Sequence, residues 1–126
     1  MFHFKRAFTR MFTVSGRASR SEYHYSILLF FIFTFIGLFA FEHRVFIIIV
    51  LASVIMMHTA LIRRIHDLGY AAKLFSFGYG LPLNMWWNMS MSFSKGEPRK
   101  NKWGLPPEWE EKGITSEEQA RFLGIL

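Results

Sequence analysis

Three long stretches of the chain lack Asp, Glu, Lys and Arg, and they dominate its hydrophobic pattern. They run over residues 23–41, 45–62 and 74–94. The first two are apolar on every helical face, which is typical of helices in a bilayer and unlike surface helices of a water-soluble domain. A helix needs about 20 mostly apolar residues to cross the hydrocarbon core, because lipid cannot pair with free backbone groups. The pattern therefore predicts an all-α membrane protein.

Local signals place the ends of the first two helices. Ser19 and Glu22 are spaced as in a capping box, in which the hydroxyl and the carboxylate each satisfy a free amide at a helix start. We predict a first membrane helix over 20–41 and a second over 45–68, joined by a tight turn into an antiparallel hairpin. Gly69 follows the second helix, where a left-handed backbone is often required and glycine adopts it at low cost.

The third stretch, 74–94, is interrupted by residues that break a helix or make it polar. These residues are Gly78, Gly80, Pro82, Asn84 and Asn88. Two interpretations remain open: the segment crosses the bilayer packed against the hairpin, or it folds back on one side. The expected fold is therefore a helical hairpin plus a third transmembrane or re-entrant helix.

The first 13 residues form an amphipathic pattern. Large apolar residues recur at helical spacing and basic residues lie opposite them, namely Phe4, Phe8, Met11 and Phe12 against Lys5, Arg6 and Arg10. A helix of this kind lies flat on an anionic membrane surface. We expect an interfacial N-terminal helix over 1–13 that precedes the hairpin; an arginine-bearing, acid-poor targeting presequence is the alternative.

Length and composition fit one membrane domain. The chain has 126 residues, of which 52% are hydrophobic, and a formal net charge of +6. This length accommodates one domain, which we place at 1–107, with a basic segment at 95–107 and an acidic C-terminal tail at 108–126. The chain has no cysteine, so the sequence excludes disulfides, thiolate metal sites and a cysteine nucleophile.

Basic residues flank the predicted hairpin unevenly. The arm and the residues after the second helix carry most of them, whereas the connection contributes only Arg44, beside Glu42. Basic residues in short loops favour the cytoplasmic side, so we expect a multi-pass protein with a cytoplasmic N-terminus. The side on which 95–107 lies depends on the path of 74–94. Membrane orientation already accounts for the cations, and no nucleic-acid partner is expected.

Three motifs resemble one bacterial family. They are VSGRASRSEYHYSILLF at 14–30, IRRIHDLGY at 62–70 and GEPRKNKWGLPP at 96–107. In this order they are similar to the inner-membrane proteins of domain of unknown function 805, the YhaH-like family. The resemblance implies a small integral protein of the bacterial inner (cytoplasmic) membrane with a cytoplasmic N-terminal arm. It implies no established activity and does not extend over 108–126.

Ionisable residues gather where both predicted helices meet the cytoplasmic face. They are Arg17, Arg20, Glu22, Arg63, Arg64, His66 and Asp67. Our hypothesis is mutual neutralisation, in which the two carboxylates are shared among the four arginines and tie the first helix to the second. Arg63 and Asp67 are spaced to pair along one face. An interface anchor, with arginine heads in water, and a contact to anionic lipid headgroups are further interpretations.

His58 is a separate candidate, because it is ionisable and lies within the second helix. A proton relay or ion contact is one interpretation, and a hydrogen bond to a neighbour near the interface is the other. His58 and His66 are two turns apart, too far to share a metal ion, so no metal site is expected. The sequence has no phosphate loop, GxSxG or HExxH motif, and we expect neither an enzyme nor a cofactor.

Two functions fit these features. The first is a non-enzymatic scaffold or accessory subunit in contact with the lipid bilayer and its anionic headgroups, acting as a homo-oligomer or within a larger membrane complex. The alternative is a small transporter-like or ion-conducting oligomer that uses His58 and the broken third helix.

Overall fold

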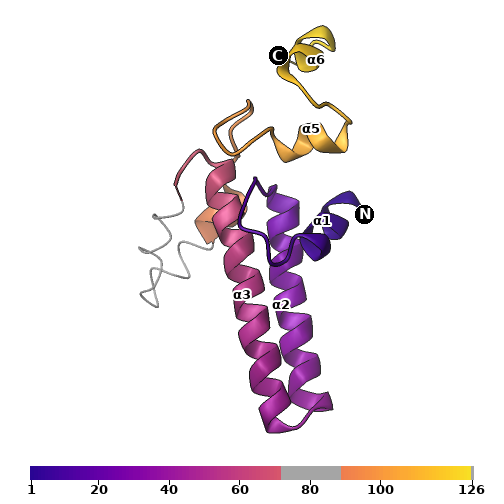
Figure 1. The fold of residues 1–126 in the computed structure, drawn as a ribbon, viewed down its shortest axis with the longest axis vertical. Coiled ribbons are helices and arrows are strands. Elements are labelled where there is room, and N and C mark those ends of the chain that lie inside the picture. The colour runs from indigo at the N-terminus through magenta and orange to yellow at the C-terminus, as the bar shows by residue number, and fades with distance from the viewer. Residues whose placement is uncertain (72–88, 126) are drawn as a thin grey trace.

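The computed structural model describes residues 1–71 and 89–125, and its regular elements in these ranges are all helices (Figure 1). They are α1 (Phe2–Thr9), α2 (Arg20–Ala40), α3 (His43–Asp67), α5 (Pro107–Glu111) and α6 (Glu117–Phe122). Residues 89–93 are also helical. The remainder of the third helix predicted at 74–94 lies outside the described residues.

Helices α2 and α3 form the predicted antiparallel hairpin, connected by Phe41 and Glu42 (Figure 1). Both are long and apolar enough to cross a membrane. At 1.5 Å per residue they extend about 31 Å and about 37 Å, compared with a hydrocarbon core of about 30 Å. Helix α3 begins at His43 rather than at residue 45, because exposed polar side chains are compatible with a helix start in water.

Most of the hairpin surface is exposed and apolar. We call residues 27–40 and 45–62 the apolar shaft, because these ranges contain no Asp, Glu, Lys or Arg. Its large side chains that are more than half exposed are Phe31, Phe35, Leu38, Phe39, Ile48, Leu51 and Ile55. In water, continuous apolar surface of this kind marks a partner or a membrane.

Small residues bring the two helices together within the shaft. Gly37 is buried, and a Cβ added there would lie 3.2 Å from Ile49 Cγ2 and 3.3 Å from Phe46 Cδ2. Ser53 is buried as well, and its hydroxyl donates to the Ile49 carbonyl at 2.7 Å. The hydroxyl is thereby satisfied within its own helix, and the helices pack through small side chains, as membrane helices commonly do.

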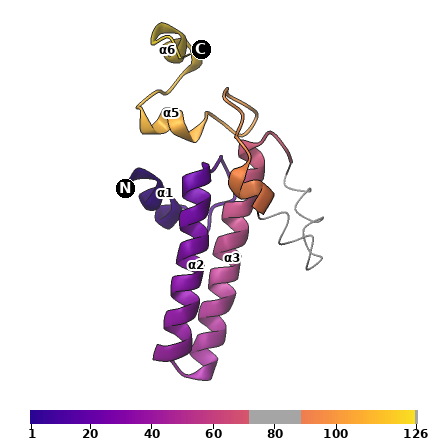
Figure 2. The ribbon, with the colours of Figure 1, turned by 180° about the vertical axis from the view of Figure 1, so that it is seen from behind.

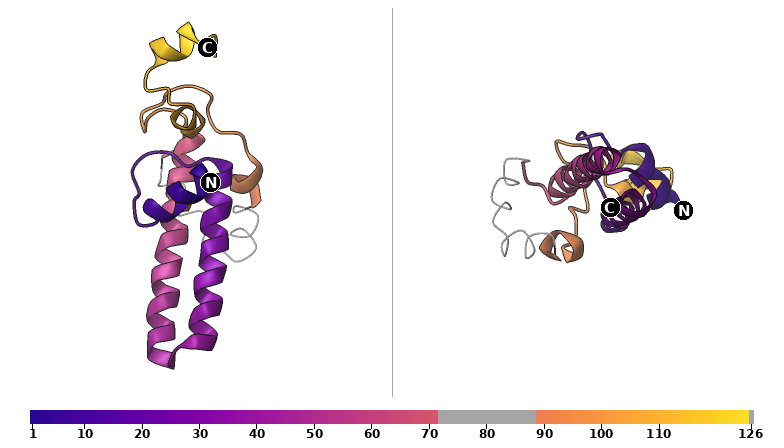
Figure 3. Two further views of the ribbon diagram at one scale, coloured as in Figure 1. Left: turned by 90° about the vertical axis from the view of Figure 1, so that its right-hand side faces the viewer. Right: turned by 90° about the horizontal axis from the view of Figure 1, so that it is seen from below.

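The remaining helices lie toward one end of the hairpin, where α2 begins and α3 ends; we call this the polar end. Helix α1 packs against α2, and it lies near the polar end in the left view of Figure 3. Helices α5 and α6 lie beyond it (Figure 2), and the connection formed by Phe41 and Glu42 lies at the opposite end. Trp109, Ile114 and Ala120 form a small core of their own in the tail.

Candidate functional site

Six ionisable residues are buried together at the polar end, and we call them the buried ion cluster. They are Arg6, Arg17, Glu22, Arg63, Arg64 and Asp67, each at most 6% exposed. They come from α1, the loop that follows it, the first turn of α2 and the last turns of α3. Arg63 and Arg64 therefore do not extend to water as an interface anchor would; both guanidinium groups are enclosed by the protein.

Glu22 joins three helices. The start of α2 forms as predicted, since the Glu22 amide donates to the Ser19 hydroxyl at 3.1 Å. The carboxylate accepts from Arg63 Nη1 of α3 and, at 2.9 Å, from Arg6 Nε of α1. It is thus engaged with two guanidinium groups, and in the described chain it does not complete the predicted capping box.

Asp67 forms the second ion pair of the cluster. Its Oδ1 accepts from Arg17 Nε at 2.9 Å, and its Oδ2 accepts from Arg64 Nη1. The predicted pair between Arg63 and Asp67 is wrong, because Arg63 faces α2 and donates to Glu22. Spacing along one helix did not reveal which side chain the neighbouring helix would engage.

Arg17 ties the segment after residue 89 to the hairpin. Its Nη1 donates to the carbonyls of Arg99 at 2.7 Å and Gly104 at 3.3 Å, and its Nη2 donates to the carbonyl of Asp67 at 3.3 Å. The Glu97 amide also donates to the Asp67 carbonyl at 2.8 Å. Residues 97–104 are therefore fastened to the end of α3.

Arg64 makes the same connection from α3. Its Nε donates to the Met91 carbonyl at 3.0 Å, its Nη1 to the Ala18 carbonyl at 3.2 Å, and its Nη2 to the Ser94 carbonyl. We call residues 89–104 the returning segment. The chain leaves α3 at the polar end, and the returning segment is bound at that same end.

Two glycines allow this close approach. Gly69 follows α3 with φ +85°, as predicted, and a Cβ there would overlap the Glu97 carboxylate. A Cβ at Gly96 would overlap the carboxylate of Asp67. Only glycine fits at either position without moving a buried or hydrogen-bonded side chain.

His66 positions the loop before α2 and the returning segment. Its Nδ1 donates to the Gly16 carbonyl at 3.2 Å, and its ring stacks on Trp103 with 4.5 Å between ring centroids and 9° between planes. The His66 carbonyl accepts from Asn101 Nδ2 at 2.9 Å. His66 therefore lies at the edge of the buried ion cluster and contacts two segments distant in sequence.

Two other residues singled out by the sequence are not part of the buried ion cluster. Arg20 is exposed and forms no ion pair with any residue that the structure describes. His58 lies in the apolar shaft, where its Nδ1 donates to the Val54 carbonyl at 2.7 Å, within its own helix. The structure thus brings together five of the predicted ionisable residues in ion pairs and places His66 at their edge, but neither Arg20 nor His58 belongs to the cluster.

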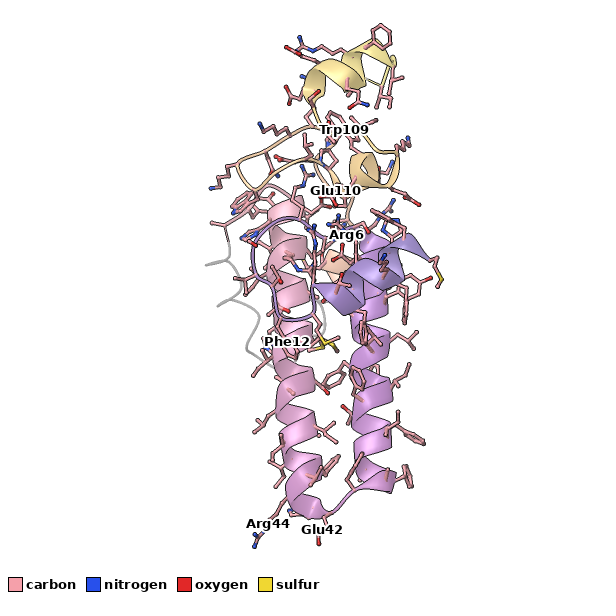
Figure 4. All side chains as sticks on the ribbon, turned by 45° about the vertical axis from the view of Figure 1, so that its right-hand side comes forward. Arg6, Phe12, Glu42, Arg44, Trp109 and Glu110 are labelled. Atoms are coloured by element: carbon pink, nitrogen blue, oxygen red, sulfur yellow. The ribbon has the colours of Figure 1, made fainter. Side chains whose placement is uncertain are left out.

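Sequence reasoning missed two members of the arrangement, Arg6 and Glu110. The arm was expected to place Arg6 on the basic face of a helix that lies on an anionic membrane surface, but Arg6 points inward and also forms an ion pair with Glu110 of α5 (Figure 4). His3 extends the contact, since its Nε2 lies 3.1 Å from Glu111 Oε2. One signal was present in the arm: His3, Arg6 and Arg10 recur on one helical face beside the small Ala7.

The cluster has more positive than negative charge. Its four arginines face two carboxylates, and Glu110 adds a third from the tail. Among the described residues, Nε and Nη2 of the fully buried Arg63 have no hydrogen-bond partner. Partial burial, and then repulsion from Arg6, lower the pKa of Arg10 at the rim. The arrangement can fasten helices together and attract anions.

Metal binding has no geometric basis in the part of the chain that the structure describes. No group of three or more His, Cys, Asp and Glu residues there is placed to hold an ion. The two carboxylates of the cluster are each engaged by two guanidinium groups.

Comparison with known families confirms the resemblance noted in the sequence. A family described as "Protein of unknown function (DUF805)" matches residues 11–105, which is more than half of the chain. No curated protein and no solved structure matches the chain. The matched range begins after α1 and ends before α5, so both Arg6 and Glu110 lie outside it.

Proposed function

The chain belongs to the DUF805 family of proteins of unknown function, and from that premise we propose that it is a non-enzymatic scaffold or accessory subunit of the bacterial inner membrane. One observation carries the proposal. The hairpin exposes an apolar shaft, while its buried charges are collected at one end. A membrane protein whose buried charged residues all lie on one side of the bilayer requires this separation of apolar and charged residues.

The apolar shaft is suited to lipid. A charged residue at the centre of a membrane helix costs about 2.5–3.5 kcal/mol on insertion, and the shaft contains no Asp, Glu, Lys or Arg. At its far end lie Glu42 and Arg44, both exposed (Figure 4). We infer that the hairpin of α2 and α3 spans the bilayer and that these two residues emerge on the opposite surface.

The orientation follows from the returning segment. A third crossing would deliver residues 89–104 to the far surface, but Arg17 and Arg64 hold them at the polar end. The described residues on both sides of 72–88 therefore lie at the polar end. The basic residues of the arm and of 95–104 then share one side, opposite Arg44, and the positive-inside rule assigns that side to the cytoplasm.

Helix α1 supplies a contact with anionic lipid. Its Arg6 faces the protein, whereas Phe4, Phe8 and the nearby Phe12 are exposed. Phe12 lies toward the apolar shaft in Figure 4. Aromatic rings at this level bury in the boundary between headgroups and acyl chains, and the exposed Lys5 reaches the phosphates.

A scaffold role follows from how the charges are used. Glu22 and Asp67 are saturated by guanidinium groups and leave no free carboxylate in the cluster for acid–base chemistry. The cluster instead fixes α1, α2, α3 and the returning segment as one unit. Such a unit presents α5 and α6 to a second copy of the chain or to a larger membrane complex.

Reconstitution tests this proposal against the conducting alternative. The full-length protein is placed in liposomes, and proton and ion flux are compared with protein-free liposomes, while cross-linking reports self-association. We expect no added flux and a stable oligomer, or capture within a larger complex when membranes are cross-linked. Flux that His58→Ala abolishes would contradict the scaffold role.

A further inference from the structure

A cleft of about 380 Å³ opens at the polar end beside the buried ion cluster. One side is the start of α2, with Ser19 and Arg20, and another is the chain from Lys95 to Pro98. The third side comes from the tail, including Trp109 and Lys112. Arg64 and Asp67 also line it, so the cleft lies directly against the buried charges.

Three cations from separate parts of the chain line this cleft: Arg20, Lys95 and Lys112. All three are exposed, and none forms an ion pair with a described residue. They differ in this respect from Arg17 and Arg64, whose guanidinium groups are committed to Asp67 and to carbonyls. Their charges are available to a ligand.

The acidic residues of the lining do not fully cancel these cations. Glu97 and Glu108 form no ion pair with a described residue, so two carboxylates oppose the three cations and leave one positive charge in excess. The buried ion cluster next to the cleft has more arginines than carboxylates, and this excess adds positive potential to the cleft. The first turn of the 21-residue helix α2, which begins at Arg20, contributes its positive dipole end.

We propose that the cleft binds one phosphate group, carried by an anionic lipid headgroup or by a soluble phosphate ester. The oxygens of a phosphate group are arranged tetrahedrally and accept charge-assisted hydrogen bonds from several directions. The three cations lie on separate parts of the chain around the cleft and can donate such bonds. The lipid source rests on the proposed function, because it requires the polar end to lie at the membrane surface. The soluble source does not.

The tail completes this site. Four residues of the tail line the cleft, namely Glu108, Trp109, Lys112 and Ile125. Together with Pro106 and Pro107, which precede the tail, they lie outside the range of the family match. Arg20 and Lys95 lie within the matched range, whereas Lys112, the third cation, comes from the tail. Phosphate binding is thus a property of the whole chain.

The test uses the full-length protein purified in an uncharged detergent. Calorimetry measures binding of inorganic phosphate, and native mass spectrometry measures retention of phosphatidylglycerol after reconstitution in phosphatidylcholine with and without that lipid. The test variant combines Arg20→Gln, Lys95→Gln and Lys112→Gln. Lys100→Gln is the matched control, because Lys100 is exposed on the same segment but does not line the cleft.

At least one of the two ligands should bind at least about tenfold more weakly to the triple variant, because these cations supply the charge-assisted hydrogen bonds to the phosphate oxygens. Lys100→Gln should leave binding unchanged, and Glu108→Gln should strengthen it. Loss of inorganic phosphate binding identifies a soluble ligand, and loss of lipid retention alone identifies a headgroup.

The proposal is overturned if the triple variant binds both ligands like the wild type, or if Lys100→Gln weakens binding as much. Failure of the proposed function has a different signature. A chain that stays monodisperse in plain buffer but still binds phosphate through these cations would refute the membrane scaffold and retain the cleft.

Discussion

The apolar shaft and the polar end of the same hairpin are held together by different forces. In the shaft, α2 and α3 touch through small residues such as Gly37 and present large apolar side chains outward. At the polar end, Glu22 and Asp67 each accept hydrogen bonds from two guanidinium groups in the protein interior. The shaft presents its side chains outward to its surroundings, whereas the polar end pairs its charged side chains with other parts of the chain.

This difference shows where the specificity of the fold lies. Lipid tails are as apolar as the shaft, so the hydrophobic effect does not select one helix pairing within the bilayer. Buried ion pairs do select, because a carboxylate without its partners is left charged and desolvated. We infer that the cluster fixes the register of the hairpin and the place of the returning segment.

The largest effect should follow from removing a carboxylate of the cluster. Glu22→Ala leaves Arg63 with no acceptor in the described chain and Arg6 with only Glu110 among carboxylates. Breaking a buried ion pair costs about 3–5 kcal/mol, and we expect a loss of this size in chemical denaturation in detergent.

Glu42→Ala is the matched control for that variant. Glu42 is exposed at the other end of the hairpin, and its side chain forms no capping hydrogen bond to α3. Its removal should change stability by no more than about 0.5 kcal/mol. Equal stability of the two variants would show that the ion cluster does not hold the helices.

A charge on the shaft should prevent insertion. Phe35 is 66% exposed within the part of the apolar shaft that α2 forms, and Phe35→Lys should cost about 2.5–3.5 kcal/mol of insertion free energy. Membrane fractionation of cells then shows less protein in the bilayer. Were the shaft in water, the same change would raise solubility and leave folding intact.

Phe122→Lys provides the corresponding control in the tail. Phe122 ends α6 and is 90% exposed, beyond the polar end. Its replacement should leave the membrane fraction unchanged, whereas a loss equal to that of Phe35→Lys would place the tail in lipid as well.

Gly96→Ala should have a moderate effect on the polar end. The added Cβ overlaps the carboxylate of Asp67, and overpacking of this kind costs about 1–3 kcal/mol. Thermal unfolding should show the loss, together with faster proteolysis of the returning segment. Gly104→Ala, where an added Cβ has no neighbour within 4 Å, tests backbone strain without the overlap and should not release that segment.

The smallest effect is expected at Arg20. Arg20→Gln should alter stability by no more than about 0.5 kcal/mol, because the side chain is exposed and without an ion pair in the described structure. Arg17→Gln, three residues earlier, should be severely destabilising because Arg17 is buried against Asp67. Similar unfolding curves would show that burial does not separate these two arginines.

The hairpin and much of the site were predictable from local signals. Charge-free stretches marked α2 and α3, Ser19 marked the start of one, and Gly69 marked the end of the other. Clustering of ionisable residues at both helix ends pointed to one polar end. These signals work because helix caps and lipid solvation depend on residues close together in the sequence.

The pairings themselves were not predictable. Arg63 was assigned to Asp67 by spacing, but the face of α3 toward α2 directs it to Glu22. Arg6 was assigned to the basic face of an interfacial helix, although the fold turns it toward Glu22 and Glu110. Such contacts depend on how distant segments pack, and helical periodicity within one segment carries no information about them.

Sidedness in intact cells tests whether the polar end and the far connection lie on opposite membrane surfaces. Because the chain has no cysteine, each of His43→Cys, Ala71→Cys and Lys100→Cys introduces a unique thiol for a membrane-impermeant reagent. We predict labelling at position 43 alone, with 71 and 100 reacting only after the inner membrane is permeabilised. Labelling at 100 together with 43 would contradict the return of the chain to the polar end, and labelling at both 43 and 71 would contradict a spanning hairpin.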